Sequence, residues 1–213
     1  AKIISNKVKT LYCIEPSSAI DIAKDNLKEN KNCIFLRESD SNMSIKDNSM
    51  DFGYSLGVLH HVPDTQKAIK SCSKLLKKGA PFLLYIYYAF DNRPWWFFWL
   101  WKVTDILRRF ISRLSPKLKI LLTDLIAYLI YFPVARTYKI LEKLKINTRK
   151  LPLSFYKDQS LYTMRTDSRD RFGTILEKRF SKSEIKEMME NADLVDIKFS
   201  ANEPFWCAVG IKK

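Results

Sequence analysis

Two patterns of apolar residues alternate along the first ninety positions of the chain. Short, nearly continuous apolar runs lie at residues 7–15, 32–38, 50–58 and 80–89. Between them, residues 16–30 and 64–78 place apolar side chains three and four positions apart, as on one face of a helix. This order predicts an α/β protein with an open, mostly parallel sheet and helices on both faces.

Polar residues at the predicted helix starts support this interpretation. Ser17 or Ser18 can cap the first helix, and Asp64 can cap the second. The end of the chain returns to the same pattern, with one predicted helix and two predicted strands at residues 180–194, 195–200 and 204–213. We expect the last two strands to form an antiparallel hairpin at the side of the sheet.

Residues 91–150 follow a different pattern. Four of the five tryptophans fall in RPWWFFWLWK at 93–102, and the apolar segment KILLTDLIAYLIYF follows at 119–132. We expect two or three helices here, inserted after the strand at 80–89.

The aromatic run from Trp95 to Trp101 is open to three interpretations. A membrane-spanning helix needs about 20 apolar residues. Lys102 and Asp124 interrupt the two apolar segments, so we expect no span. An interfacial membrane segment and a helical cap over an active site are equally consistent with the pattern.

The net charge of +14 at pH 7 is concentrated in the same region. Thirteen Lys and Arg residues lie between Arg93 and Lys150 with only three acidic residues, so this segment carries a charge of +10. Such a field attracts phosphate groups and favours peripheral contact with an anionic membrane. The aromatic residues are clustered rather than spread as a stacking platform, so we expect no nucleic-acid partner.

Length and composition place the chain among globular proteins. Its 213 residues are 46% hydrophobic and 28% charged, unlike a disordered composition. The cysteines are Cys13, Cys33, Cys72 and Cys207. Their wide spacing contains no CxxC pair, so we expect reduced thiols in a cytoplasmic protein and no metal site.

Several segments, taken together, resemble a known family. They are LYCIEPS at 11–17, DNSMDFGYSLGVLHHVPD at 47–64, KLLKKGAPFLLY at 74–85 and SKSEIKEMMENADLVDIKF at 181–199. In this order they resemble the class I S-adenosylmethionine-dependent methyltransferases of the type 11 subgroup. The resemblance covers about residues 7–90 and 176–213, and it implies a Rossmann-like core. It divides the chain into core residues 1–90, an inserted helical, basic cap at 91–175, and core residues 176–213.

The resemblance implies that S-adenosylmethionine binds at the carboxyl ends of the strands. Glu15 matches the acid that binds both ribose hydroxyls of this cofactor, and a carboxylate suits the role because it offers two acceptor oxygens. Further cofactor contacts are implied for Pro16, Ser39, Asp40, Leu56 and Gly57.

The family's glycine-rich loop, which follows its first strand, has no counterpart in the sequence. The chain contains only five glycines, and its opening AKIISNKV resembles the last turn of the helix after that loop. Only glycine permits the close backbone approach at such a turn. We therefore expect an N-terminally truncated core that lacks the first strand and the cofactor loop.

His60 and His61 are the two histidines of the chain and follow the strand at 50–58. Neighbouring residues of a strand point to opposite faces, so we expect that they do not share a metal. Either one is a candidate catalytic base or substrate contact, because histidine titrates near neutral pH. The alternative is packing at the strand–helix junction, since positioning alone can drive methyl transfer.

Residues 154–174 are polar and aromatic. Candidate substrate contacts here are Tyr162, Arg165, Asp170 and Arg171, and a solvated linker is the alternative. Together these observations predict methyl transfer to a small or lipid-linked acceptor in the cytoplasm, with peripheral membrane contact. The alternative is a non-catalytic membrane-surface or scaffold protein that retains a degenerate methyltransferase fold.

Overall fold

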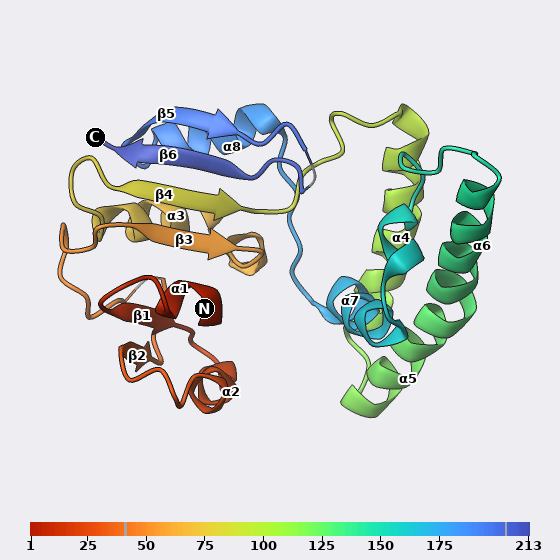
Figure 1. The fold of residues 1–213 in the computed structure, drawn as a ribbon, viewed down its shortest axis with the longest axis horizontal. Coiled ribbons are helices and arrows are strands. Elements are labelled where there is room, and N and C mark those ends of the chain that lie inside the picture. Colours follow the sequence, from red (N-terminus) through yellow and green to blue (C-terminus); the bar gives the residue numbers. More distant parts are fainter. Residues whose placement is uncertain (41, 203) are drawn as a thin grey trace. The chain divides into compact units, whose positions relative to one another are not determined.

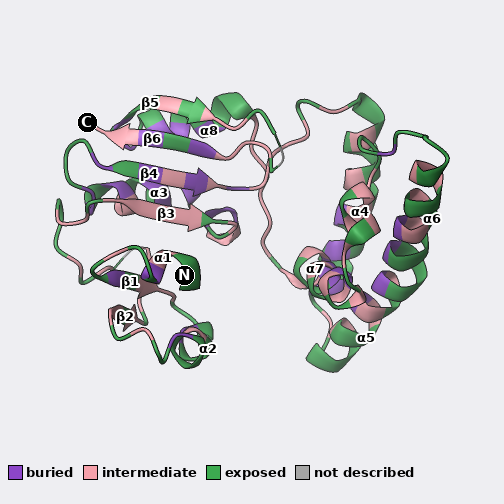
Figure 2. Cartoon of the chain, viewed as in Figure 1, coloured by how far each residue is buried: buried purple, intermediate pink, exposed green. Residues whose placement is uncertain are grey.

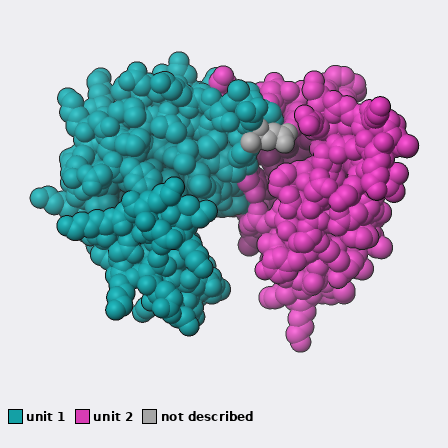
Figure 3. Space-filling view, viewed as in Figure 1, with its two compact units in different colours: residues 1–86, 183–213 teal, residues 87–182 magenta. Residues whose placement is uncertain are grey.

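The computed structural model describes residues 1–40, 42–202 and 204–213. They form two compact units (Figure 3). Unit 1 contains residues 1–86 and 183–213, and unit 2 contains residues 87–182. The chain therefore leaves unit 1 after its fourth strand, builds unit 2, and returns to complete unit 1.

The described strands of unit 1 form two sheets (Figure 1). They are β1 (Leu11–Ile14), β2 (Cys33–Leu36), β3 (Gly53–Leu56), β4 (Pro81–Tyr85), β5 (Leu194–Phe199) and β6 (Ala208–Lys212). β1 and β2 form a parallel pair, and the second sheet has the order β3–β4–β6–β5. β3 is parallel to β4, while β6 is antiparallel to both β4 and β5. These pairings confirm the predicted α/β sheet with an antiparallel C-terminal pair.

The predicted strand at 80–89 is longer than the observed one. Only Pro81–Tyr85 pairs within unit 1. Tyr88 instead forms an isolated parallel bridge with Phe180, which belongs to unit 2. The apolar run is continuous in the sequence, but the chain changes pairing partners part-way along it.

The helical elements of unit 1 complete its core. They are α1 (Lys2–Ser5), α2 (Ala19–Asn26), the 3-10 turn η1 (Leu59–His61), α3 (Thr65–Lys74) and α8 (Lys182–Glu190). Ser73 of α3 donates a hydrogen bond to the Ala192 carbonyl at 2.6 Å, so α3 lies beside the end of α8. The core consists of apolar side chains that are at most 2% exposed, among them Ile69, Leu76, Phe82, Leu84, Met189 and Leu194.

Side-chain caps start two of these helices. Asp64 accepts a hydrogen bond from the Lys67 backbone N–H at 2.9 Å, which confirms it as the cap of α3. For α2 the side chain that accepts is Ser17, whose Oγ is 3.2 Å from the Ala19 nitrogen. The Ser18 side chain makes no capping bond.

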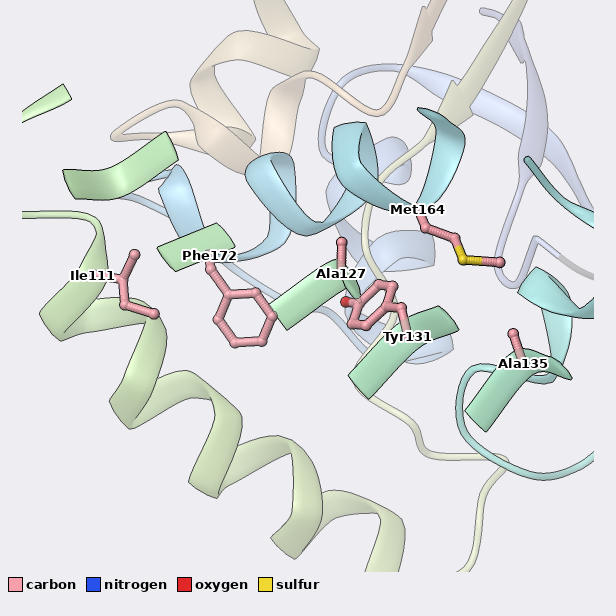
Figure 4. Close-up of a cluster of buried hydrophobic side chains, with 6 residues drawn as sticks. All are labelled: Ile111, Ala127, Tyr131, Ala135, Met164 and Phe172. Carbon is pink, nitrogen blue, oxygen red and sulfur yellow. The ribbon is translucent and has the colours of Figure 1, made fainter. Parts of the chain in front are cut away.

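Unit 2 is helical, as predicted for the insert. Its elements are α4 (Trp95–Ile111), α5 (Pro116–Ile126), the π-helical turn η2 (Ala127–Tyr131), α6 (Phe132–Lys143), the 3-10 segment η3 (Ser154–Asp158) and α7 (Leu161–Gly173). A cluster of buried side chains joins α4, α5–η2–α6 and α7 (Figure 4), and it contains Ile111, Ala127, Tyr131, Ala135, Met164 and Phe172. The linker interpretation of residues 154–174 is therefore wrong, because Met164 and Phe172 fix α7 in this cluster.

Candidate functional site

Glu15 lies at the carboxyl end of β1, and Pro16 is exposed beside it. The Glu15 backbone N–H donates to the Leu36 carbonyl at 3.1 Å, which keeps the residue level with the end of β2. Its Oε1 accepts hydrogen bonds from the Ser17 backbone N–H at 3.0 Å and the Ser17 hydroxyl at 2.5 Å. Its Oε2 has no hydrogen bond to the part of the chain that the structure describes. One carboxylate oxygen is thus available to a ligand hydroxyl.

The segment after β2 carries the next predicted residues. Glu38 accepts a hydrogen bond from the Ser44 backbone N–H at 2.8 Å, and hydrogen bonding to Ser44 holds the pKa of this carboxyl below its usual range. Ser39 and Asp40 are half-buried. Burial, with a smaller effect of the Asp40 charge, raises the pKa of the Cys72 thiol to about 11, so Asp40 lies near α3.

Gly57 turns the chain away from the end of β3. Its N–H donates to the Tyr85 carbonyl at 2.8 Å. Its φ of +72° favours glycine over any residue with a side chain. A β-carbon at this position would meet no atom within 4 Å, and the adjacent Leu56 is 49% exposed. The backbone at the end of β3 is therefore open to a ligand.

His60 and His61 lie in the turn η1, not in a strand, so the argument that their side chains point to opposite faces was wrong. Their ring centroids are 3.9 Å apart. His60 is fully buried, whereas His61 is only partly buried. Among the described residues, no group of three or more His, Cys, Asp or Glu side chains could hold a metal ion.

The structure brings some of these residues together. The register pairs Ile14 with Leu36, so Glu15 and the segment that leads to Ser39 and Asp40 start from the same edge of the β1–β2 pair. Burial, and then the nearby Cys13 and Cys33 thiols, raise the pKa of Tyr54, which places β3 close to β1 and β2.

The four substrate candidates all belong to α7 but contact different parts of unit 2. Asp170 accepts a hydrogen bond from the Tyr87 hydroxyl at 2.7 Å. Tyr162 is 77% exposed. Arg165 donates to Asp124 of α5 at 2.6 Å. Arg171 donates to the Thr104 hydroxyl of α4 at 3.0 Å and also pairs with Glu177. The structure therefore does not bring the two guanidinium groups to one place.

Unit 2 also contains a buried arginine among aromatic rings, which the sequence did not indicate. The Arg179 guanidinium lies over the rings of Tyr87, Phe90 and Trp101, at 5.0, 4.6 and 5.5 Å from their centroids. Burial lowers the pKa of Arg179, although Glu177 opposes the shift. The Glu177 side chain is fully buried, and its Oε2 has no hydrogen-bond partner within the described chain. In the sequence, Glu177-Lys178-Arg179 resembles an ordinary charged surface segment.

The comparison with protein families gives a match over the first part of the chain. Residues 1–84 match the family model described as "Methyltransferase domain". This part of the chain is therefore similar to a methyltransferase domain. The family uses S-adenosylmethionine as its methyl donor. No curated protein is detectably similar to the chain in sequence.

Solved structures share the fold of the chain at low sequence identity. An O-methyltransferase family protein from Burkholderia thailandensis is 11% identical, with a TM-score of 0.52 over 96% of this chain and 44% of its own. A protein from Bordetella parapertussis is 12% identical, with a TM-score of 0.50 over 95% of this chain and 53% of its own. The chain thus spans about half the length of these structures.

Proposed function

We propose that the chain transfers a methyl group from S-adenosylmethionine to a small or lipid-linked acceptor. The observation that carries this proposal is Glu15 at the carboxyl end of β1, with Oε2 available to a ligand. Parallel α/β sheets bind ligands at this edge. The methyltransferase match over residues 1–84 supplies the chemical class.

The residues present fit the nucleoside part of the cofactor. Glu15 would hold the ribose hydroxyls, and the segment containing Ser39 and Asp40 would lie near the adenine. The exposed backbone at Gly57 and the Leu56 side chain would lie along the methionine part of the cofactor. When bound, S-adenosylmethionine supplies an electrophilic methyl group for in-line displacement. The five glycines of the chain include no glycine-rich turn.

The two histidines would have different roles in this proposal. His60 is fully buried and would support the turn η1 after β3. His61 is partly buried and would contact the methyl acceptor or accept its proton. Positioning supplies much of the rate in such a displacement, so a base at His61 would assist rather than decide turnover.

The chemistry of unit 2 supports a lipid-linked acceptor. Its helices α4, α5 and α6 expose large apolar side chains and lie within the segment that carries a charge of +10. This combination suits a hydrophobic group that carries phosphate. We place the protein in the cytoplasm, in peripheral contact with an anionic membrane. Radiolabelled methyl groups from S-adenosylmethionine should partition into the organic phase when a total lipid extract is the acceptor source.

Calorimetric titration with S-adenosylmethionine and its demethylated product tests the cofactor site. Glu15→Gln removes a charged acceptor, and we expect it to weaken both ligands about tenfold or more. Glu29→Gln changes an exposed carboxylate elsewhere in unit 1 and should leave both affinities unchanged. Equal affinities of the native chain and Glu15→Gln would contradict the proposal.

The second candidate function is a non-catalytic scaffold or membrane-surface protein that retains the fold. The exposed apolar side chains and the charge of +10 in unit 2 favour it. It predicts no binding heat with either ligand while the far-ultraviolet circular dichroism remains that of a folded α/β protein.

A further inference from the structure

The outer face of α4 is apolar over its whole length. Five exposed side chains recur at intervals of four and three residues, which places them on one face of the helix. They are Trp95 (78% exposed), Trp99 (61%), Val103 (58%), Ile106 (68%) and Phe110 (65%). In Figure 2, much of the surface of α4 is coloured as exposed. We call these five residues the α4 stripe.

The inner face of α4 contains a buried ion pair beside apolar residues such as Ile111. Asp105 and Arg108 are each only 4% exposed, and the Arg108 Nε donates to the Asp105 Oδ1 at 2.8 Å. Arg108 also donates to the carbonyls of Thr174 and Ile175 at 2.9 and 2.8 Å. A helix in water normally has charged side chains on its solvent face and apolar ones toward the core, so an apolar outer face with a buried ion pair departs from that pattern.

The second long helix also exposes most of its large apolar side chains. α5, η2 and α6 run continuously from Pro116 to Lys143, and the most apolar 18-residue window has a mean hydropathy of 1.7 with only 22% of it buried. Its buried residues are Thr123, Ala127, Tyr131 and Ala135, of which only Tyr131 is large. Its exposed positions include Leu118, Leu121, Leu125, Leu129 and Ile130.

The charge of Asp124, which argued against a membrane-spanning helix in the sequence, is paired within the protein. Arg165 and Arg169 of α7 donate to its two carboxylate oxygens at 2.6 and 2.9 Å. Arg136, the other charge in the middle of this helix, donates to the carbonyls of Lys157 and Gln159. Both charges are satisfied inside unit 2, so neither prevents the outer face from entering an apolar medium.

We propose that the α4 stripe and the outer face of α5–η2–α6 insert into the interfacial layer of an anionic lipid bilayer. This inference rests on the membrane contact of the proposed function and names the surface that makes it; it does not depend on cofactor binding. Soluble proteins rarely expose so large an apolar area. Tryptophans beside basic residues are typical of side chains at the depth of lipid head groups.

The charge near this face favours an anionic bilayer over a second copy of the chain as the partner. Exposed basic residues lie at both ends of the long helix, and they are Lys117, Lys139, Lys143 and Lys145, with Arg113 just before it. Two copies packed through this face would bring like charges together, which disfavours self-association. Anionic head groups neutralise the same charges.

Flotation of the full chain with vesicles tests the surface. The vesicles are phosphatidylcholine alone, or phosphatidylcholine with phosphatidylserine. The triple variant Trp99→Gln, Ile106→Gln, Phe110→Gln replaces only exposed side chains, so it should fold. We expect it to bind vesicles with phosphatidylserine at least about tenfold less than the native chain. The control Ile3→Gln, Ile22→Gln changes equally exposed side chains of unit 1 and should bind as the native chain does.

Charge removal and fluorescence give independent readouts. Arg113→Gln with Lys117→Gln should lower binding to phosphatidylserine vesicles about tenfold and have little effect with phosphatidylcholine alone. Brominated lipids should quench the native tryptophan fluorescence.

Three results would overturn the proposal. They are undiminished flotation of the triple variant, equal binding to both vesicle types, and a stable dimer in solution that the triple variant dissociates without any lipid binding. Calorimetry with S-adenosylmethionine in the absence of lipid reports separately on the cofactor site, so the two proposals can fail independently.

Discussion

Unit 2 buries more charged side chains and exposes more large apolar ones than unit 1 does. The fully buried side chains of unit 1 are mainly aliphatic and aromatic, such as Ile69, Phe82 and Leu84. In unit 2 the buried residues include Asp105, Arg108 and other polar ones, while tryptophans and leucines are exposed. The difference teaches that a hydrophobic pattern predicts burial only once the surrounding medium is known.

The largest expected loss of stability comes from a cavity in the core of unit 1. Phe82→Ala should lower the free energy of unfolding by about 3–5 kcal/mol, because the Phe82 side chain is only 2% exposed. The matched change Phe110→Ala on α4, where the side chain is 65% exposed, should cost less than about 0.5 kcal/mol in water. Urea denaturation measures both. Similar losses would show that the α4 stripe is packed in solution.

The next effect concerns the polar interior of unit 2. Arg108→Met leaves the buried Asp105 carboxylate with Arg109 as its remaining ionic partner, and it should cost about 3 kcal/mol. The double variant Asp105→Leu, Arg108→Met removes both charges and should recover part of this loss, because the hydrogen bonds to the Thr174 and Ile175 carbonyls stay lost. Thermal unfolding in detergent micelles measures both variants. A double variant no more stable than the single one would contradict the interpretation.

The same ion pair predicts how acid affects unit 2. Burial alone would raise the pKa of Asp105, but hydrogen bonds and charges of Arg108 and Arg109 outweigh it and hold the pKa below its usual range. A carboxyl whose pKa is lower in the folded state stabilises that state above its unfolded pKa of about 4. This contribution is lost as the pH falls through the folded pKa. Native Asp105 should therefore give a steeper loss of melting temperature below about pH 4 than the double variant.

The smallest expected loss of stability comes from removing a side-chain cap at the start of a helix in unit 1. Asp64→Ala removes the side-chain cap of α3 and should cost about 1 kcal/mol, and Asp64→Asn should restore most of it. Ser18→Ala is the matched control, because the Ser18 side chain makes no capping bond. A loss at Ser18 equal to that at Asp64 would show that the α3 cap contributes nothing specific.

Features set by neighbouring residues could be predicted from the sequence. The parallel strands, the antiparallel C-terminal pair and the cap at Asp64 all follow from local patterns. The turn containing His60 and His61 could not, because its apolar run continues from β3 and only Gly57, at φ +72°, redirects the chain. The sequence indicated the acid at Glu15 but not that Ser17 would occupy one of its oxygens.

Features set by distant residues could not be predicted. Asp124 meets Arg165, which is 41 positions away, and Arg108 meets the Thr174 carbonyl, which is 66 positions away. Without these partners, charges within apolar segments look like interruptions. Arg179 among its three aromatic rings is a further case, because the rings come from segments that precede it by more than seventy residues.

The position of β6 has a consequence for the order of folding. β6 follows unit 2 in the sequence, yet it lies between β4 and β5 in the sheet. During synthesis β4 must therefore wait, with one edge unpaired, until the whole of 87–182 has left the ribosome. Unit 2, whose helices form mainly from local contacts, can fold in that interval. Translation that stops before residue 208 would leave β4 without its neighbour and expose a strand edge to aggregation.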